Sequence, residues 1–166
     1  VAALSNKPNI ILINCDDLGY GDLGCYGSSV NKTPNIDFLA REGMMFTDFY
    51  SASPVCSPSR GALMTGCYPK RIGFESFDGD HVLFPGHAVG LNRSEFTIPQ
   101  MLKEEGYTSM IIGKWHCGDQ EEFLPLQHGF DRYYGLPYSN DMGMQLNTQK
   151  RKVRKHPPLP LIENND

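Results

Sequence analysis

The sequence has no apolar run long enough to span a membrane as a helix, and this absence excludes an ordinary transmembrane segment. Charged residues are also few, at 20% of the 166 residues, which is too low for a typical disordered tail. The same composition fits collagen, coiled coils and obligate nucleic-acid binders poorly. What remains, 40% apolar and 11% aromatic residues, is enough to fill the core of one globular unit.

Cysteine is sparse and lacks the spacing of a metal site. The five cysteines include no Cys-x-x-Cys pair, so we expect no zinc site. Because five is an odd number, a full disulfide framework would leave one cysteine unpaired. The chain begins with Val1 rather than Met, so we give no weight to the absence of a visible signal segment.

Acidic residues outnumber basic ones, which gives a formal net charge of -4. The basic residues are unevenly placed along the sequence. The run from Lys150 to Lys155 holds five of the 15 Lys and Arg residues. We interpret this run as a solvated, protease-sensitive loop in preference to a nucleic-acid site. From about Leu136 onward the composition turns polar, basic and rich in proline, so residues 150–166 are assigned to a basic, Pro-rich loop or linker.

Four stretches have the pattern of regular structure. The first strand is expected from a continuous run of β-branched and apolar residues, which is typical of a strand buried on both faces. Thr33 and Thr97 suit helix N-caps, and Gly43 suits a left-handed helix end. We expect strands over residues 9–14 and 107–112, and helices over residues 34–43 and 97–106. Their alternation predicts an α/β fold with a largely parallel sheet.

Polar groups follow both expected strands, where ligands of parallel sheets bind. Asp16 and Asp17 follow the first strand, and their adjacent carboxylates would accommodate a cation that prefers oxygen, Ca²⁺ or Mg²⁺. Taken alone, however, this pair is better explained as turn and cap residues. Lys114 and His116 follow the later strand, whereas Trp115 between them is expected to pack.

A third group of residues surrounds Cys56. Ser57 suits an N-cap for a helix whose first residue is Pro58, with Gly66 near its end. Cys56 would then lie at the positive end of that helix with Arg60 one turn further on, an environment that favours an anion. A buried cysteine preceding a helix explains the same pattern equally well.

Three motifs together resemble the sulfatase family. Residues Cys56–Arg60 and Leu63–Gly66 match the signature C-x-P-S-R-x-x-x-[LM]-T-G, and Gly106–His116 resembles the second signature, which ends in G-K-W-H. Asp16–Asp22 resembles the N-terminal metal motif. The stretch 128–141 is also similar to the branch containing arylsulfatase A and N-acetylgalactosamine-6-sulfatase. The resemblance implies an alkaline-phosphatase-like α/β fold, with a largely parallel sheet flanked by helices. It also implies that residues 1–149 are the N-terminal part of the catalytic domain.

The resemblance implies a specific chemistry. A formylglycine-generating enzyme would convert Cys56 to formylglycine, whose hydrated aldehyde is the nucleophile. One hydroxyl of this gem-diol attacks the ester sulfur, and the other later expels sulfate as the aldehyde re-forms. One Ca²⁺ ion would be held by Asp16, Asp17 and residue 56. Arg60 would stabilise the hydrated aldehyde, and Lys114 and His116 would be catalytic and sulfate-binding residues.

The family pattern is incomplete within these residues. The downstream Asp-Asn pair, the further His and the second Lys of sulfatases have no recognisable counterparts here. We therefore expect the C-terminal remainder of the same protein as a partner. The expected substrate is a sulfated small molecule or saccharide, with aryl sulfates as surrogates, and the expected location is secreted, periplasmic or lysosomal. Two alternatives stay open: a phosphonate monoester or phosphodiester hydrolase, and a non-catalytic metal-binding homologue.

Overall fold

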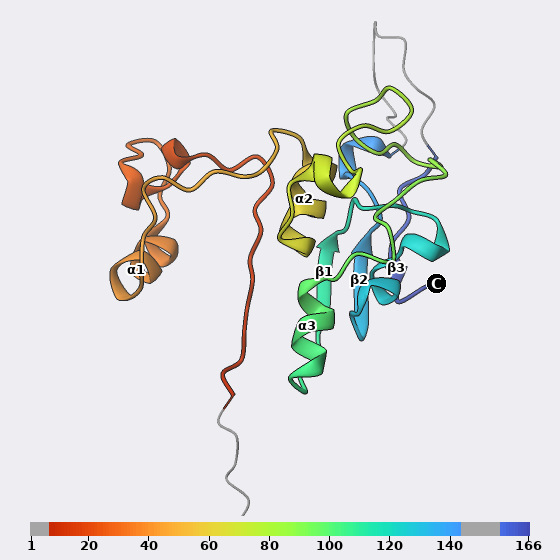
Figure 1. The fold of residues 1–166 in the computed structure, drawn as a ribbon. Coiled ribbons are helices and arrows are strands. Elements are labelled where there is room, and N and C mark those ends of the chain that lie inside the picture. The colour runs from red at the N-terminus through yellow and green to blue at the C-terminus, as the bar shows by residue number, and fades with distance from the viewer. Residues whose placement is uncertain (1–6, 144–156) are drawn as a thin grey trace, which may run out of the picture. The chain divides into compact units, whose positions relative to one another are not determined.

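The computed structural model describes residues 7–143 and 157–166 (Figure 1). It divides into two compact units, residues 1–49 and residues 50–166, here called the first and second units. Among the described residues, none of the helices has the length and apolar character needed to cross a membrane.

Local hydrogen bonds organise the first unit around the helix α1 (Pro34–Glu42), which follows the short 3-10 helices η1 (Tyr20–Asp22) and η2 (Gly24–Tyr26). Thr33 is the N-cap of α1, as predicted, and its hydroxyl donates to Asp37 Oδ1 at 2.8 Å. The same oxygen accepts from the backbone N–H of Cys25 at 2.8 Å. Gly43 ends the helix, but its φ of -123° shows that the predicted left-handed end was wrong. Its N–H completes the last helical bond, to Leu39, in an ordinary conformation.

Residues 9–14 form no strand in the structure, so that prediction was wrong. Their side chains are exposed: Ile11 by 85% and Ile13 by 75%. The β-branched residues of this segment favour an extended backbone. A strand also needs a neighbouring strand that accepts and donates its backbone hydrogen bonds. None of the strands in the described part of the chain pairs with this segment.

The second unit contains a three-stranded sheet in the order β1-β2-β3 (Figure 1). Strand β1 (Met110–Lys114) pairs in parallel with β2 (Arg132–Leu136), and β2 pairs antiparallel with β3 (Ile162–Glu163). Neither β2 nor β3 was expected, and β3 lies within the segment assigned to a loop or linker. Gly113 lies opposite Gly135, where a Cβ on Gly135 would come within 1.9 Å of the Gly113 carbonyl oxygen.

Strand β1 begins three residues later than the expected 107–112. The N–H of Tyr107 still bonds to the carbonyl of Leu102, so the turn that ends the preceding helix extends beyond it. Lys114 is consequently the last residue of the strand rather than part of the following loop. The strand is also less buried than predicted, because Met110 and Ile112 are 50% and 72% exposed.

Two helices of the second unit match the expected positions closely. Helix α3 (Ile98–Glu104) begins after the N-cap Thr97, whose N–H donates to Gln100 Oε1 at 2.8 Å. Helix α2 (Cys56–Thr65) ends at Gly66, which has a left-handed φ of 68°. The N-cap of α2 is Val55, so the prediction that Ser57 caps this helix was wrong. The Ser57 hydroxyl instead accepts a hydrogen bond from the distant Leu83 N–H.

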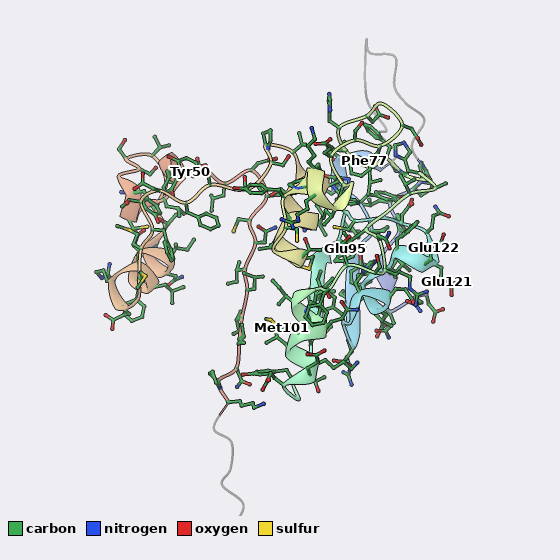
Figure 2. The ribbon with its side chains drawn as sticks, in the orientation of Figure 1. Tyr50, Phe77, Glu95, Met101, Glu121 and Glu122 are labelled. Carbon is green, nitrogen blue, oxygen red and sulfur yellow. The ribbon has the colours of Figure 1, made fainter. Side chains whose placement is uncertain are left out.

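The core of the second unit is formed by residues that come from loops as well as from regular elements. Short 3-10 helices, η3 (Pro69–Ile72), η4 (Glu121–Phe123), η5 (Pro125–His128) and η6 (Asn140–Met142), connect the main elements. The buried cluster comprises Met64, Phe74, Phe77, Leu83, Leu91, Trp115, Cys117 and Tyr133. Outside the cluster, Met101 on α3 is 49% exposed, and Glu121 and Glu122 are also exposed (Figure 2).

Candidate active site

Cys56 is the first residue of α2 and is partly buried. The free N–H groups and the dipole of a helix N-terminus favour negative charge there. Arg60 follows one turn later on the same helix and is also partly buried. The start of α2 therefore combines a partly buried cysteine with a permanent positive charge.

Arg60 connects α2 to the end of β1, because its Nη1 donates to the carbonyl oxygen of Lys114. The two residues are 54 positions apart in sequence. This bond brings the motif beginning at Cys56 next to the motif ending at His116. The Arg60 guanidinium and the backbone of Lys114 thus lie in the same part of the second unit.

Cys117, the residue after His116, lies near both motifs. It is 0% exposed, and burial raises the pKa of its thiol to about 12. Smaller opposing effects on this pKa come from Arg60, which lowers it, and from Cys56, which raises it. Cys117 is therefore a neutral packing residue beside the site and not a competing nucleophile at ordinary pH.

His116 is held rigidly at the same end of the sheet. Its N–H donates to the carbonyl of Pro137 at 2.9 Å, and its φ of 61° is in the left-handed region, which is uncommon for a non-glycine residue. The side chain is 0% exposed, and its Nε2 lies 2.9 Å from the carbonyl oxygen of Leu83. A carbonyl oxygen only accepts hydrogen bonds, so Nε2 must carry a hydrogen.

Trp115 packs in the core, as predicted. It is 1% exposed, its Nε1–H donates to the carbonyl of Phe123 at 2.8 Å, and its ring lies 5.5 Å from that of His128. His128 is itself 1% exposed. Burial, with a smaller contribution from the positive charge of Arg93, lowers the pKa of His128 to about 4. It is therefore neutral at physiological pH and supports Trp115 rather than carrying charge.

Asp16 and Asp17 belong to the first unit, where they occupy an exposed turn. Asp17 has a φ of 56°, a left-handed conformation that aspartate tolerates better than most residues. Their oxygens are of the kind that Ca²⁺ prefers, but the ion usually takes six to eight of them. Residues 7–143 and 157–166 contain no group of three or more His, Cys, Asp or Glu side chains placed to hold a metal. The described residues therefore supply the right donor type without a complete coordination shell.

Two residues that hold His116 through their backbones were not predicted from the sequence. Leu83 and Pro137 contribute carbonyl oxygens to His116, and no side-chain pattern signals such a role. The position of Tyr133 in a strand could have been predicted, since the two aromatic residues at 133–134 suit a strand. It is 0% exposed, and burial raises the pKa of its hydroxyl, which the nearby Arg60 partly opposes.

Comparison with known proteins shows the family. The model of the Sulfatase family matches residues 8–156. The chain belongs to the sulfatase family. Among curated proteins it is 48% identical to N-acetylgalactosamine-6-sulfatase of Rattus norvegicus over 139 residues, covering 82% of this chain and 26% of the relative. It is 49% identical to arylsulfatase A of Homo sapiens over 143 residues, covering 85% and 27%.

A solved structure shows that the sulfatase fold extends over almost the whole chain. The structure concerns glycosaminoglycan metabolism by Bacteroides thetaiotaomicron. It matches with a TM-score of 0.76 and 34% identity, over 97% of this chain and 32% of that one. The predicted alkaline-phosphatase-like α/β fold is therefore confirmed. The chain spans about a quarter of the length of the curated sulfatases it matches.

Proposed function

We propose that this chain is part of a sulfuric ester hydrolase and carries the nucleophile of the reaction at residue 56. The observation that carries the proposal is the hydrogen bond from Arg60 to the Lys114 carbonyl, which joins the two sulfatase motifs. A formylglycine-generating enzyme would convert Cys56 to formylglycine, the residue that supplies a hydrated aldehyde as nucleophile. The partial exposure of Cys56 at the start of α2 is compatible with access by substrate.

The chain's own cations have separate roles in this proposal. Arg60, fixed on α2 one turn from residue 56, orients and stabilises the modified side chain. Lys114 binds a sulfate oxygen with its ammonium group, where a positive charge offsets the negative charge that develops in the transition state. His116 is the second sulfate-binding residue in this proposal, and the Leu83 carbonyl holds its ring through Nε2–H.

We also propose that Asp16, Asp17 and residue 56 contribute ligands to one Ca²⁺ ion. This assignment rests on the resemblance of Asp16–Asp22 to the metal motif of the family and on the oxygen donors of the two carboxylates. When bound, the ion would polarise a sulfate oxygen. Further ligands would have to come from polypeptide outside these residues, because two carboxylates and one oxygen of residue 56 do not complete the shell.

The proposed substrate is a sulfate ester on a carbohydrate, with small aryl sulfates as surrogates. The names of the relatives support it, since one is a sulfatase of N-acetylgalactosamine and another an arylsulfatase. An enzyme of this kind would act in a secreted, periplasmic or lysosomal location. No role for nucleic acid is proposed.

We further propose that residues 1–149 are the N-terminal part of the catalytic domain and that a longer polypeptide completes it. The support is the quarter-length match to the relatives and the exposure of apolar side chains in the first unit, such as Ile11 and Val30. Denaturing gels and intact mass of active material should show this additional polypeptide. Active, calcium-loaded protein made of these 166 residues alone would contradict the proposal.

Two measurements test the chemistry. Mass spectrometry of the peptide containing residue 56 should show formylglycine, and the same preparation should release sulfate from an aryl sulfate faster than it cleaves an aryl phosphodiester. Preferential phosphodiester cleavage would favour the alternative hydrolase. Replacing Asp17 by Ala should lower both the activity and its dependence on added Ca²⁺. Activity that a chelator leaves unchanged would remove the metal assignment.

A further inference from the structure

The backbone of Leu83 connects the residue after Cys56 with His116. Its N–H donates to the hydroxyl oxygen of Ser57 at 3.1 Å, and its carbonyl oxygen lies 2.9 Å from His116 Nε2. Ser57 and His116 are 0% exposed and Leu83 is 3% exposed, so water does not compete for these bonds. The arrangement spans three segments that are 26 and 33 residues apart in sequence.

The donor and the acceptor of each hydrogen bond in this chain can be assigned. A carbonyl oxygen has no hydrogen to give, so the Leu83 oxygen requires a hydrogen on His116 Nε2. A neutral imidazole protonated at Nε2 has its lone pair on Nδ1, and a second hydrogen-bonding partner is what selects between the two tautomers. The Leu83 carbonyl shares a peptide plane with the N–H of Phe84, which lies 3.4 Å from His87 Nδ1. The other side of the Leu83 residue is anchored through its own N–H at Ser57, so both bonds fix where this backbone segment lies.

The alternative roles for Ser57 are excluded by the same geometry. Its hydroxyl does not cap α2, since the N-cap is Val55 and no side-chain cap bond is formed. It is enclosed in the second unit rather than facing solvent. Without its oxygen, the buried N–H of Leu83 would lose its hydrogen-bond acceptor, and the segment around residue 83 would have to move to find another.

We propose that Ser57 is a positioning residue that acts through the Leu83 backbone to hold His116 in a single tautomer, with hydrogen on Nε2, and in a single orientation. The tautomer is set by residues of this chain alone and can be measured without enzymatic activity. Its effect on catalysis rests on the proposed function of His116. Ser57 itself touches neither the substrate nor the reacting atoms in this proposal.

Nitrogen NMR of the histidine ring tests the positioning directly. In ¹⁵N-labelled protein at neutral pH, long-range ¹H–¹⁵N spectra should show His116 as one species protonated at Nε2, with the signal assigned by its loss in His116→Gln. In Ser57→Ala, the ring should populate both tautomers, whereas Ser57→Thr, which keeps the hydroxyl, should restore one. Ser76→Ala is the matched control, because Ser76 is exposed and lies before Leu83 in the same loop.

Different NMR results would overturn the His116 tautomer and the role of Ser57. Wild-type His116 protonated at Nδ1 would overturn the arrangement, and an unchanged tautomer in Ser57→Ala would overturn the role of Ser57. If thermal unfolding shows that Ser57→Ala does not fold, Ser57→Cys keeps the volume with a much weaker acceptor and should show the second tautomer. An unchanged tautomer in folded Ser57→Cys would then count against the proposal.

Kinetics of the active enzyme provide a second readout. With the formylglycine content at residue 56 equalised by mass spectrometry, Ser57→Ala should lower kcat roughly 10- to 100-fold while KM changes by less than about twofold. Ser57→Thr should recover most of kcat. An unchanged kcat would show that positioning by Ser57 does not matter to catalysis. A wild-type protein that releases no sulfate would contradict the proposed function but would leave the tautomer measurement valid.

Discussion

Trp115, Tyr133 and Leu91 of the second unit are almost fully enclosed, whereas Ile11, Ile13 and Leu39 of the first unit are each more than half exposed. Both units nevertheless form helices with threonine N-caps, at Thr33 and Thr97. Threonine therefore marks the start of a helix in either setting, although Thr97 forms a capping box with Gln100 and the Thr33 hydroxyl donates to the side chain of Asp37. The units differ in burial, which requires residues distant in sequence to meet.

The difference matters for function because the second unit joins two of the three sulfatase motifs by itself. Arg60 and Lys114 are linked there, while the acidic pair lies in the unit without a buried residue among those described. The residues proposed as nucleophile and sulfate ligands therefore lie in the unit that has a packed core. The proposed metal ligands Asp16 and Asp17 are held by an exposed turn.

The largest effect should come from the start of α2. We expect Cys56→Ala to lower sulfate release by about 10⁴-fold or more, because no other group takes the place of the nucleophile. Cys67→Ala, just beyond the same helix, is the control and should retain activity. Hydrolysis of an aryl sulfate measures both variants, and substantial turnover by Cys56→Ala would rule out covalent catalysis at this residue.

Loss of a core side chain should distinguish the two units in stability. Trp115→Ala should reduce the free energy of unfolding by about 3–5 kcal/mol, since it removes a large ring at the centre of the buried cluster. In this chain alone, without the proposed additional polypeptide, Ile11→Ala should change it by less than about 0.5 kcal/mol, because that side chain is 85% exposed. Urea unfolding of both variants provides the comparison. A large loss for Ile11→Ala would mean that this segment is covered in the protein.

The pH dependence of the second unit should reflect His128. Its folded pKa of about 4 is below the ordinary value of 6.5, so the unfolded chain binds the extra proton more readily between these values. The contribution to stability is therefore complete above pH 6.5 and lost as the pH falls toward 4, by roughly 3 kcal/mol in total. His128→Phe should flatten this part of the unfolding curve measured by urea titration at several pH values. An identical slope in both proteins would assign the dependence to other groups.

The smallest effects should come from the helix caps, where the units resemble each other. Thr33→Ala and Thr97→Ala should each destabilise their helix by about 1 kcal/mol. Amide hydrogen exchange can resolve them separately, with faster exchange confined to the first turn of α1 or α3. The Thr97 variant should show a somewhat larger effect, because its hydroxyl also donates to the His128 carbonyl at 2.6 Å. Equal effects would show that this added bond contributes little.

The sequence predicted best what depends on neighbouring residues. Thr33, Thr97 and Gly66 act at helix ends as expected, and the functional motifs were recognisable from their residues alone. The failures share one cause. Pairing of residues 9–14 depends on a distant strand, and the role of Ser57 depends on the distant Leu83. The start of β1 depends on the Tyr107 N–H, which bonds to the preceding helix instead of a strand. Such partners leave no local pattern in the sequence.

The paired glycines of β1 and β2 have a consequence for how this region tolerates mutation. A Cβ at position 135 would overlap the Gly113 carbonyl oxygen, so any other residue there must push β1 sideways or shift its register. A shift of one residue reverses the face of every side chain in the strand, including Lys114 at its end. In a saturation mutagenesis screen, position 135 should therefore be as intolerant as a catalytic position, although glycine brings no functional group to the reaction.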